Sequence, residues 1–169
     1  AGIILQARYG SARLRGKALE PIAGRTMLEQ CLRRLIRAGV ARVVLATTCE
    51  PEDDALAAIA TRLGVGVFRG ATDDVLARYA DAARHFNFDL IIRATGDNPA
   101  VDVQAPGRVL AALRATEADY IREENVPWGA SVEGFTAAAL ERADTLARDA
   151  YDREHVTTFI RHHRELFRV

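Results

Sequence analysis

The chain has 169 residues, and its 23 acidic and 23 basic side chains cancel to a formal net charge of zero. This length suits a single domain over residues 1–169, with a core large enough to fold alone. The balanced charge argues against a nucleic-acid partner, because polyanion-binding proteins usually carry a basic excess. No apolar run approaches the roughly 18 residues of a membrane span, and no signal-peptide pattern opens the sequence. We therefore expect a cytoplasmic protein without a membrane partner.

Short apolar runs alternate with longer amphipathic stretches along the chain. The first run, residues 3–7, predicts a buried strand. A helix follows from Thr26, which has capping-box spacing to Glu29, and ends at Gly39. Next come a strand over 42–47, a helix over 51–63, a strand over 65–68 and a helix over 73–86. The last predicted elements are strands over 88–94, 119–121 and 131–135 and helices over 104–116, 136–147 and 152–163.

This alternation predicts an α/β fold with three layers, in which helices cover both faces of a mostly parallel sheet. Such sheets bind ligands beyond the carboxyl ends of their strands. The segments that follow the strands, 8–17, 47–54, 69–74 and 94–102, are therefore the places to look for a site.

The segment 8–17 is rich in glycine and positive charge. Gly10 and Gly16 bracket five residues, and the segment carries Arg8, Arg13, Arg15 and Lys17. Glycines let backbone N–H groups approach phosphate oxygens, and the cations match phosphate charge. The spacing fits neither a Walker A loop nor a dinucleotide fingerprint. The composition indicates phosphate binding, with a solvated basic loop as the alternative.

Lysine occurs only once in the chain, as Lys17. An ammonium group is a compact point charge, whereas a guanidinium group is a planar fork. The single lysine among arginines therefore suggests a site that does not accept arginine.

The segment 94–99 reads Ala-Thr-Gly-Asp-Asn-Pro and directly follows a predicted strand. In this position the Asp97 carboxylate is placed to hold Mg²⁺ beside bound phosphates. The alternative is a plain turn, which Gly96 and Pro99 also favour.

Residues 4–17 and 93–99, together with 46–48, 51–54, 67–70, 73–79 and 153–157, resemble the signature of the cytidylyltransferases that make CMP-activated sugar acids. The resemblance is to the acylneuraminate and spore-coat polysaccharide branch, and it covers nearly the whole chain in the family's order. It implies the Rossmann-like fold of nucleotide-diphospho-sugar transferases. It also implies transfer of CMP from CTP to an acceptor, with release of pyrophosphate.

The resemblance also implies roles for individual residues. Lys17, Arg13 and Asp97 would be catalytic, and Asp97 would bind Mg²⁺, the expected cofactor. Glu154 and His155 match a motif near the acceptor side or a dimer contact, and Glu133 is a weaker acceptor-side candidate. The residues implied to bind the nucleotide are Ala7, Arg8, Gly10, Ser11, Arg13, Lys17, Thr47, Arg69 and Thr95.

Two departures from the family pattern leave the second metal ligand open. Ser131 stands where the family carries an acidic residue, and the family's later strand, with a Thr-Val-Asp-Thr-type motif, would lie beyond Val169. Asp102 and Glu133 are substitute ligands to consider. If neither residue serves as the second metal ligand, the sequence would be a fragment, or one domain of a larger biosynthetic enzyme.

The acceptor is open between a sugar acid and a small hydroxyalkylphosphonate. An oxygen that is already anionic needs neither a base nor a second metal, and this favours the phosphonate; the family resemblance favours the sugar acid. A competing hypothesis is a nucleotide-binding or assembly module that has lost its catalytic activity. For the oligomeric state, a homodimer is a further possibility. A basic-loop nucleic-acid binder is disfavoured by the zero net charge.

Overall fold

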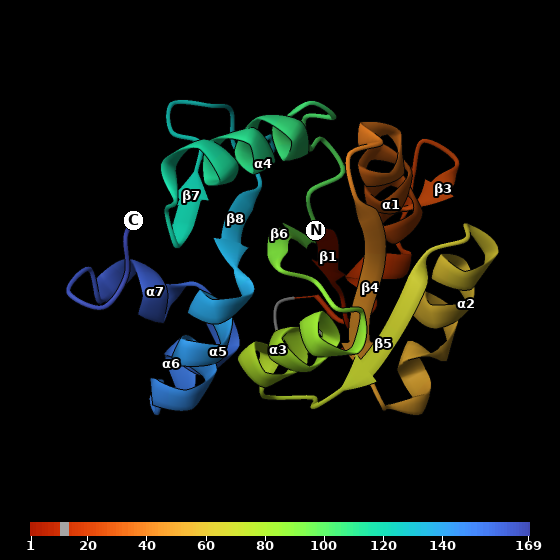
Figure 1. Cartoon of the computed structure of the whole chain (residues 1–169). Helices are drawn as coiled ribbons and strands as arrows, with labels where there is room; N and C mark the ends of the chain where they lie inside the picture. Colours follow the sequence, from red (N-terminus) through yellow and green to blue (C-terminus); the bar gives the residue numbers. More distant parts are fainter. Residues whose placement is uncertain (11–13) are drawn as a thin grey trace.

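A central sheet of six strands organises the protein, for which a computed structural model describes residues 1–10 and 14–169 (Figure 1). The strands lie in the order β5-β4-β1-β6-β8-β7. The first four run parallel, whereas β8 is antiparallel to both β6 and β7. The predicted, mostly parallel sheet is confirmed. The strands span β1 Gly2–Gln6, β4 Arg42–Thr48, β5 Gly66–Gly70, β6 Leu90–Thr95, β7 Tyr120–Arg122 and β8 Glu133–Thr136.

Helices cover both faces of this sheet, which confirms the three-layer arrangement. One face packs against α1 (Met27–Ala38), α2 (Asp54–Arg62) and α4 (Ala105–Thr116). The other packs against α3 (Val75–His85), α5 (Ala137–Leu146) and α7 (Thr158–His162), and α6 (Ala150–His155) packs on α3 and α7. Two single turns of 3-10 helix, η1 (Lys17–Leu19) and η2 (Pro51–Asp53), precede α1 and α2.

The central strand β1 is buried on both sides. Its Ile3 and Leu5 belong to the core beneath α1, α2 and α4, and Ile4 belongs to the core on the opposite face. All three side chains have no exposed surface. Burying each contributes roughly 1.5–3 kcal/mol, so the strand that leads into the segment 8–17 is firmly anchored.

The helix predicted over 152–163 is in fact two short helices, α6 and α7. Val156, between them, has φ 62° and ψ −57° and is fully buried. The Thr157 N–H donates to the His155 carbonyl at 2.6 Å, which closes a tight three-residue turn. Burial of Val156 and the hydrogen bond from Thr157 Oγ1 to Glu133 hold this turn, which periodicity alone does not reveal.

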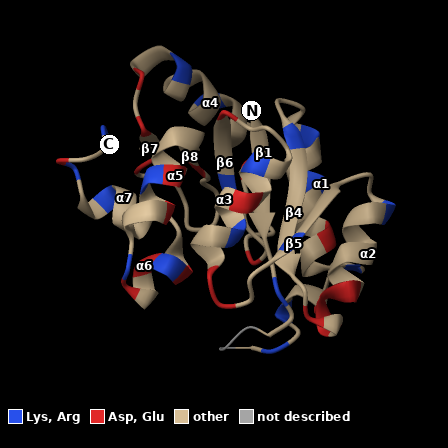
Figure 2. Cartoon of the chain, turned by 60° about the horizontal axis from the view of Figure 1, so that its bottom comes forward, with Lys and Arg blue, Asp and Glu red and all other residues tan. Residues whose placement is uncertain are grey.

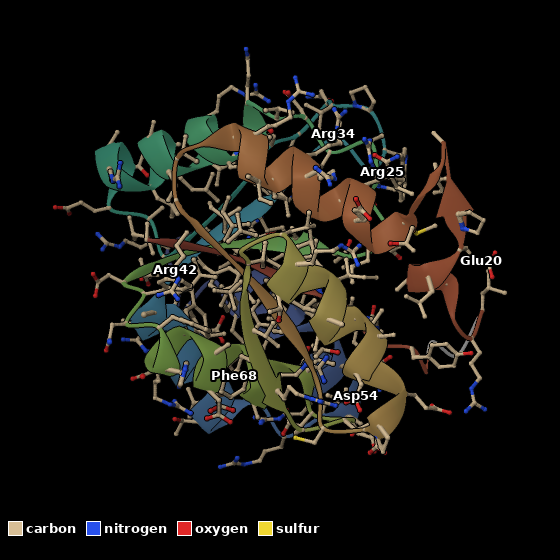
Figure 3. All side chains as sticks on the ribbon, turned by 90° about the vertical axis from the view of Figure 1, so that its right-hand side faces the viewer. Glu20, Arg25, Arg34, Arg42, Asp54 and Phe68 are labelled. Atoms are coloured by element: carbon tan, nitrogen blue, oxygen red, sulfur yellow. The ribbon has the colours of Figure 1, made fainter. Side chains whose placement is uncertain are left out.

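A small hairpin, β2 (Pro21–Ile22) and β3 (Arg25–Thr26), was not predicted. Its turn residues Ala23 and Gly24 both have positive φ angles, as a tight hairpin turn requires. The hairpin lies beside the first turn of α1 (Figure 3). The predicted cap of that helix is confirmed, because Thr26 Oγ1 accepts from the Glu29 N–H at 3.2 Å.

Charges of both signs are distributed over the elements (Figure 2). Within the described part of the chain, no helix combines the length and apolar character needed to cross a bilayer.

Helix α4 lies so close to β8 that only glycine fits at position 134. A Cβ added there would stand 2.4 Å from a Val109 methyl carbon and 2.8 Å from one of Leu113. We expect Gly134→Ala to lower the free energy of unfolding by about 1–3 kcal/mol, because the helix must move outward. Urea denaturation measures this change.

Gly107→Ala, within α4 itself, is the matched control. A Cβ at Gly107 would meet only Val40, at an ordinary 3.5 Å. This substitution should be neutral or stabilise by up to about 1 kcal/mol, since glycine weakens helices. Equal destabilisation by both substitutions would refute the packing argument.

Candidate active site

A cavity of about 270 Å³ opens at the carboxyl ends of β1 and β6, and we call it the cationic cavity. Most of the predicted site residues among the described ones meet here. Those that line it are Ala7, Arg8, Lys17, Thr95, Asp97, Glu154 and His155. They come from segments as far apart as residues 7 and 155, and the parallel sheet brings them together.

The pairing of β1 with β6 builds one edge of this cavity. Gln6 lies opposite Thr95 in register, and the Gly96 N–H donates to the Gln6 carbonyl at 2.8 Å. A Cβ at Gly96 would stand 2.8 Å from the Ala7 Cβ, so this approach requires glycine. The turn that carries Asp97 is thereby held against the end of β1.

Lys17 and Asp97 form an ion pair across this edge. Lys17 Nζ lies 2.8 Å from Asp97 Oδ2. Partial burial would raise the pKa of the Asp97 carboxyl, but hydrogen bonds from Lys17 and Thr95 keep it below its usual value. Asp97 therefore stays ionised and, with 36% of its side chain exposed, remains open to the cavity.

The segment 8–17 closes into a loop through backbone contacts. The Gly16 N–H donates to the Tyr9 carbonyl at 2.8 Å, and Gly16 has φ 77°, which favours glycine. Gly10 is exposed, and a Cβ there would meet none of the described atoms within 4 Å. The predicted phosphate contacts Ser11 and Arg13 lie outside the described residues.

Asp53 ties this loop to the end of β4, a role that sequence reasoning missed. Its buried carboxylate accepts from the Tyr9 N–H at 2.7 Å, the Thr47 hydroxyl at 2.9 Å and the Thr48 N–H at 3.0 Å, and also from the Thr48 hydroxyl. Asp53 also occupies the N-cap position of α2, but its side chain makes no cap bond to that helix. Burial opposes ionisation, yet these hydrogen bonds lower the pKa of the Asp53 carboxyl.

Besides the exposed Gly10, two predicted nucleotide contacts do not line the cationic cavity. Thr47 is fully buried, with its hydroxyl bonded to Asp53. Arg69 lies at the edge formed by β4 and β5, where it donates to the Thr48 and Glu50 carbonyls and pairs with Asp54. Both residues therefore organise the segment after β4.

Arg78 and Arg93 line the cationic cavity; both lie in the family-like segments 73–79 and 93–99, but the sequence assigned no role to either. Arg78, on α3, is 1% exposed and donates from Nη1 to the carbonyls of Ala71 and Thr72. Arg8 Nη1 donates to the same Thr72 carbonyl at 2.8 Å. Two guanidinium groups thus fix the turn that follows β5.

Glu133 lines a second cavity of about 480 Å³, which shares Arg93 and Thr95 with the cationic cavity. Glu133 accepts hydrogen bonds from Arg93, from the Tyr120 hydroxyl at 2.6 Å and from Thr157 at 3.1 Å. Burial would raise the pKa of the Glu133 carboxyl, but Arg93 and these hydrogen bonds keep it lowered.

Neither carboxylate considered as a second metal ligand is poised for that role. Glu133 is engaged as above, and Asp102 pairs with Arg108 at 2.7 Å and accepts from the Gln104 N–H. Among the residues that the structure describes, no three acidic, His or Cys side chains gather as a metal cluster.

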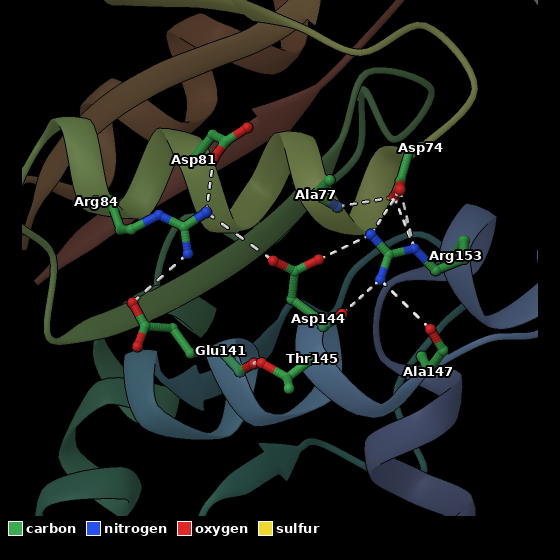
Figure 4. Close-up of polar contacts among 9 residues, drawn as sticks. All are labelled: Asp74, Ala77, Asp81, Arg84, Glu141, Asp144, Thr145, Ala147 and Arg153. Carbon is green, nitrogen blue, oxygen red and sulfur yellow. Dashed lines mark hydrogen bonds and ion pairs between the residues drawn. The ribbon is translucent and has the colours of Figure 1, made fainter.

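Arg153 fixes the helix that presents Glu154 and His155 (Figure 4). Its Nε lies 3.0 and 2.9 Å from the two carboxylate oxygens of Asp74, and its Nη2 donates to Asp144 at 2.8 Å. Asp74 also caps α3 by accepting from the Ala77 N–H at 2.9 Å. Arg153 thus fastens α6 to α3 and α5.

Trp128 does not anchor its loop on the core, because its side chain is fully exposed.

The charges of the cationic cavity favour an anionic ligand. Its described lining carries four cations, Arg8, Lys17, Arg78 and Arg93, against the two carboxylates Asp97 and Glu154. A positively charged cavity beyond the carboxyl ends of parallel strands is typical of proteins that bind nucleotides and other phosphates.

Comparison with known proteins identifies the family to which the chain belongs. The family model described as cytidylyltransferase matches residues 2–169. The chain belongs to this cytidylyltransferase family, and its fold is that of the nucleotide-diphospho-sugar transferases. The predicted family and fold are confirmed.

Individual relatives agree with this assignment. The chain is 36% identical to spore coat polysaccharide biosynthesis protein SpsF of Bacillus subtilis, covering 98% of this chain and 72% of the relative. It is 30% identical to the 3-deoxy-manno-octulosonate cytidylyltransferase of Aeromonas salmonicida, covering 82% and 55% respectively. A cytidylyltransferase structure from Leptospira borgpetersenii superposes with a TM-score of 0.93 at 35% identity, covering 99% of this chain and 73% of that one.

Because Asp53 accepts four hydrogen bonds in a buried site, its ionised form stabilises the fold. We expect Asp53→Asn to lower the free energy of unfolding by about 2–3 kcal/mol at neutral pH, because the amide cannot accept all four bonds. The stabilisation by Asp53 should be complete above the unfolded-state pKa of about 3.9 and be lost as the pH falls through the lower folded value.

Urea denaturation between neutral and acidic pH measures both effects, with Asp81→Asn, at an exposed surface pair with Arg84, as the control. The Asp53→Asn variant should show a weaker loss of stability in acid than the unmodified chain. An unchanged acid profile would contradict the assigned role.

Proposed function

We propose that the protein transfers a cytidylyl group from CTP to an anionic acceptor of the sugar-acid class, with release of pyrophosphate. The observation that carries the proposal is the Lys17–Asp97 pair, at 2.8 Å, on the rim of a cavity with excess positive charge. The family supports cytidylyl transfer. The Aeromonas relative, named for 3-deoxy-manno-octulosonate, supports a sugar acid as acceptor.

The triphosphate would lie along the segment 8–17, with Lys17 beside its reacting phosphates. An acceptor oxygen attacks the α-phosphorus in line as the bond from that phosphorus to the bridging oxygen breaks, and pyrophosphate leaves. The chemistry needs mainly positioning and neutralisation of charge. The Lys17 ammonium group offsets the charge that grows on the leaving pyrophosphate.

A sugar hydroxyl must also lose its proton during the attack. Glu154 and His155 line the cavity, and a carboxylate or an imidazole in this position can accept that proton. Arg153 fixes the helix that carries both. This arrangement supports an acceptor hydroxyl, whereas a phosphonate oxygen would need no such base.

Mg²⁺ is part of the proposal, with Asp97 as its protein ligand. Mg²⁺ often binds through one or two carboxylates while substrate phosphates and waters complete its shell. Asp97 is ionised and accessible, so its chemistry fits this role. When bound, the ion would neutralise phosphate charge at the reacting centre.

The geometry of the Lys17–Asp97 pair gives a reason for lysine at this position. We expect Lys17→Arg to lower kcat/KM about 100-fold, because a planar guanidinium does not replace a compact ammonium between a carboxylate and phosphates. Asp97→Asn should lower kcat by a similar or larger factor. Pyrophosphate release from CTP with 3-deoxy-manno-octulosonate, and separately with a hydroxyalkylphosphonate, measures both.

Arg37→Lys, on the exposed side of α1, is the matched control and should leave the rate unchanged. Full activity of Lys17→Arg would refute the role of the ammonium. CTP binding without turnover on either acceptor would instead support a nucleotide-binding module that has lost its chemistry.

A further inference from the structure

Three residues on the cationic cavity have buried polar atoms without a hydrogen-bond partner among the described residues. They are Gln6 Oε1, Arg78 Nε and Arg93 Nε. The described part of the chain has five such atoms, and three of them belong to this one cavity. Because buried polar groups are almost always hydrogen-bonded, this cluster offers unused donors and an acceptor to a polar ligand.

Arg78 has the strongest need for an anionic ligand among the three residues. It is 1% exposed, and within the described residues no carboxylate lies at ion-pair distance from it. A buried charge without a countercharge is costly. Its Nη1 is used by the carbonyls of Ala71 and Thr72, which leaves the edge formed by Nε and Nη2 for a ligand. Two parallel N–H groups on this edge match a carboxylate or phosphate.

Arg93 repeats this arrangement on β6. Its Nη1 donates to Glu133, and its Nε has no partner among the described groups. Glu133 is shared with Tyr120 and Thr157, which orient it toward Arg93. The protein therefore fixes one side of each guanidinium and leaves the Nε side of both unused.

Gln6 places the opposite requirement on the ligand. Its orphan atom is an acceptor, so the ligand must also supply a donor. The phosphates of CTP offer oxyanions but no donor, and its ribose hydroxyls and cytosine amino group offer donors without an anionic charge beside them. A hydroxy acid offers both a carboxylate and hydroxyl groups.

We propose that Gln6, Arg78 and Arg93 form the subsite that selects a hydroxy-acid acceptor. The acceptor's carboxylate lies on the Nε edges of the two arginines, and one of its hydroxyls donates to Gln6 Oε1. This inference rests on the proposed function and assigns its acceptor specificity to these residues. Arg93 also lines the second cavity, where Asn98, Asn125 and Ser131 provide polar contacts for the rest of a polyhydroxylated acceptor.

NMR of the arginine Nε–H and glutamine side-chain signals tests the proposal directly. The chain is titrated with D-glycerate, a small hydroxy acid, and separately with glycerol, which lacks the carboxylate. Glycerate should shift the Arg78 and Arg93 Nε–H signals and the Gln6 amide signals, and glycerol should not. A third titration with CTP and Mg²⁺ should shift signals of the segment 8–17 and leave the glycerate site open.

Substitutions of the two arginines distinguish binding of the acceptor from binding of the nucleotide. Arg93→Lys and Arg78→Lys should each weaken glycerate binding about tenfold or more, because lysine lacks the two-pronged edge. The affinity for CTP should fall much less than the affinity for glycerate, because lysine keeps the positive charge of the cavity. Arg93→Lys gives an independent reading if Arg78→Lys, in its buried site, fails to fold.

Three outcomes would overturn the inference: no response to glycerate, an equal response to glycerol, or an Nε–H response to CTP alone with a matching loss of CTP affinity in the variants. CTP binding without a glycerate response rejects only the acceptor subsite. Absence of CTP binding rejects the proposed function itself, so the two failures are distinguishable.

Discussion

The close approach of the turn after β6 to the end of β1 is the constraint on which the site depends. Gly96 packs against Ala7 so tightly that a Cβ would stand 2.8 Å from the Ala7 Cβ. This contact places Asp97 within 2.8 Å of Lys17, although 80 residues separate them in the sequence. Parallel pairing of β1 with β6 makes the approach possible, because both strands then end at the same edge. The cationic cavity is thus a direct consequence of the sheet's topology.

Buried charged groups fasten the surrounding loops to this frame. Asp53 holds the start of the segment 8–17, Glu133 holds Arg93, and Arg153 holds the helix that carries Glu154 and His155. A charged group fixed by several hydrogen bonds positions its neighbours closely, and removing one partner leaves a costly buried charge. A site held in this way needs little rearrangement when its ligands arrive, which favours catalysis by positioning.

Local patterns in the sequence predicted much of this architecture. The alternation of apolar runs and amphipathic stretches gave the layers, and Thr26 with Glu29 marked the start of α1 correctly. The glycine-rich cationic segment and the turn at Asp97 meet at one edge of the sheet, as their positions after two strands predicted. The roles of Asp53, Arg78 and Arg93 were not predictable, because their partners are distant or are backbone carbonyls. The break at Val156 was also hidden, since burial and the bond from Thr157 to Glu133 override helical periodicity.

The central claim is that the Lys17–Asp97 edge receives the reacting phosphates of CTP. A crystal structure of the chain with CTP and Mg²⁺ tests this most directly. We expect the triphosphate along the segment 8–17, with Lys17 Nζ on a phosphate oxygen and Asp97 on the metal ion. A triphosphate bound away from this edge, with the Lys17–Asp97 contact undisturbed, would contradict the account.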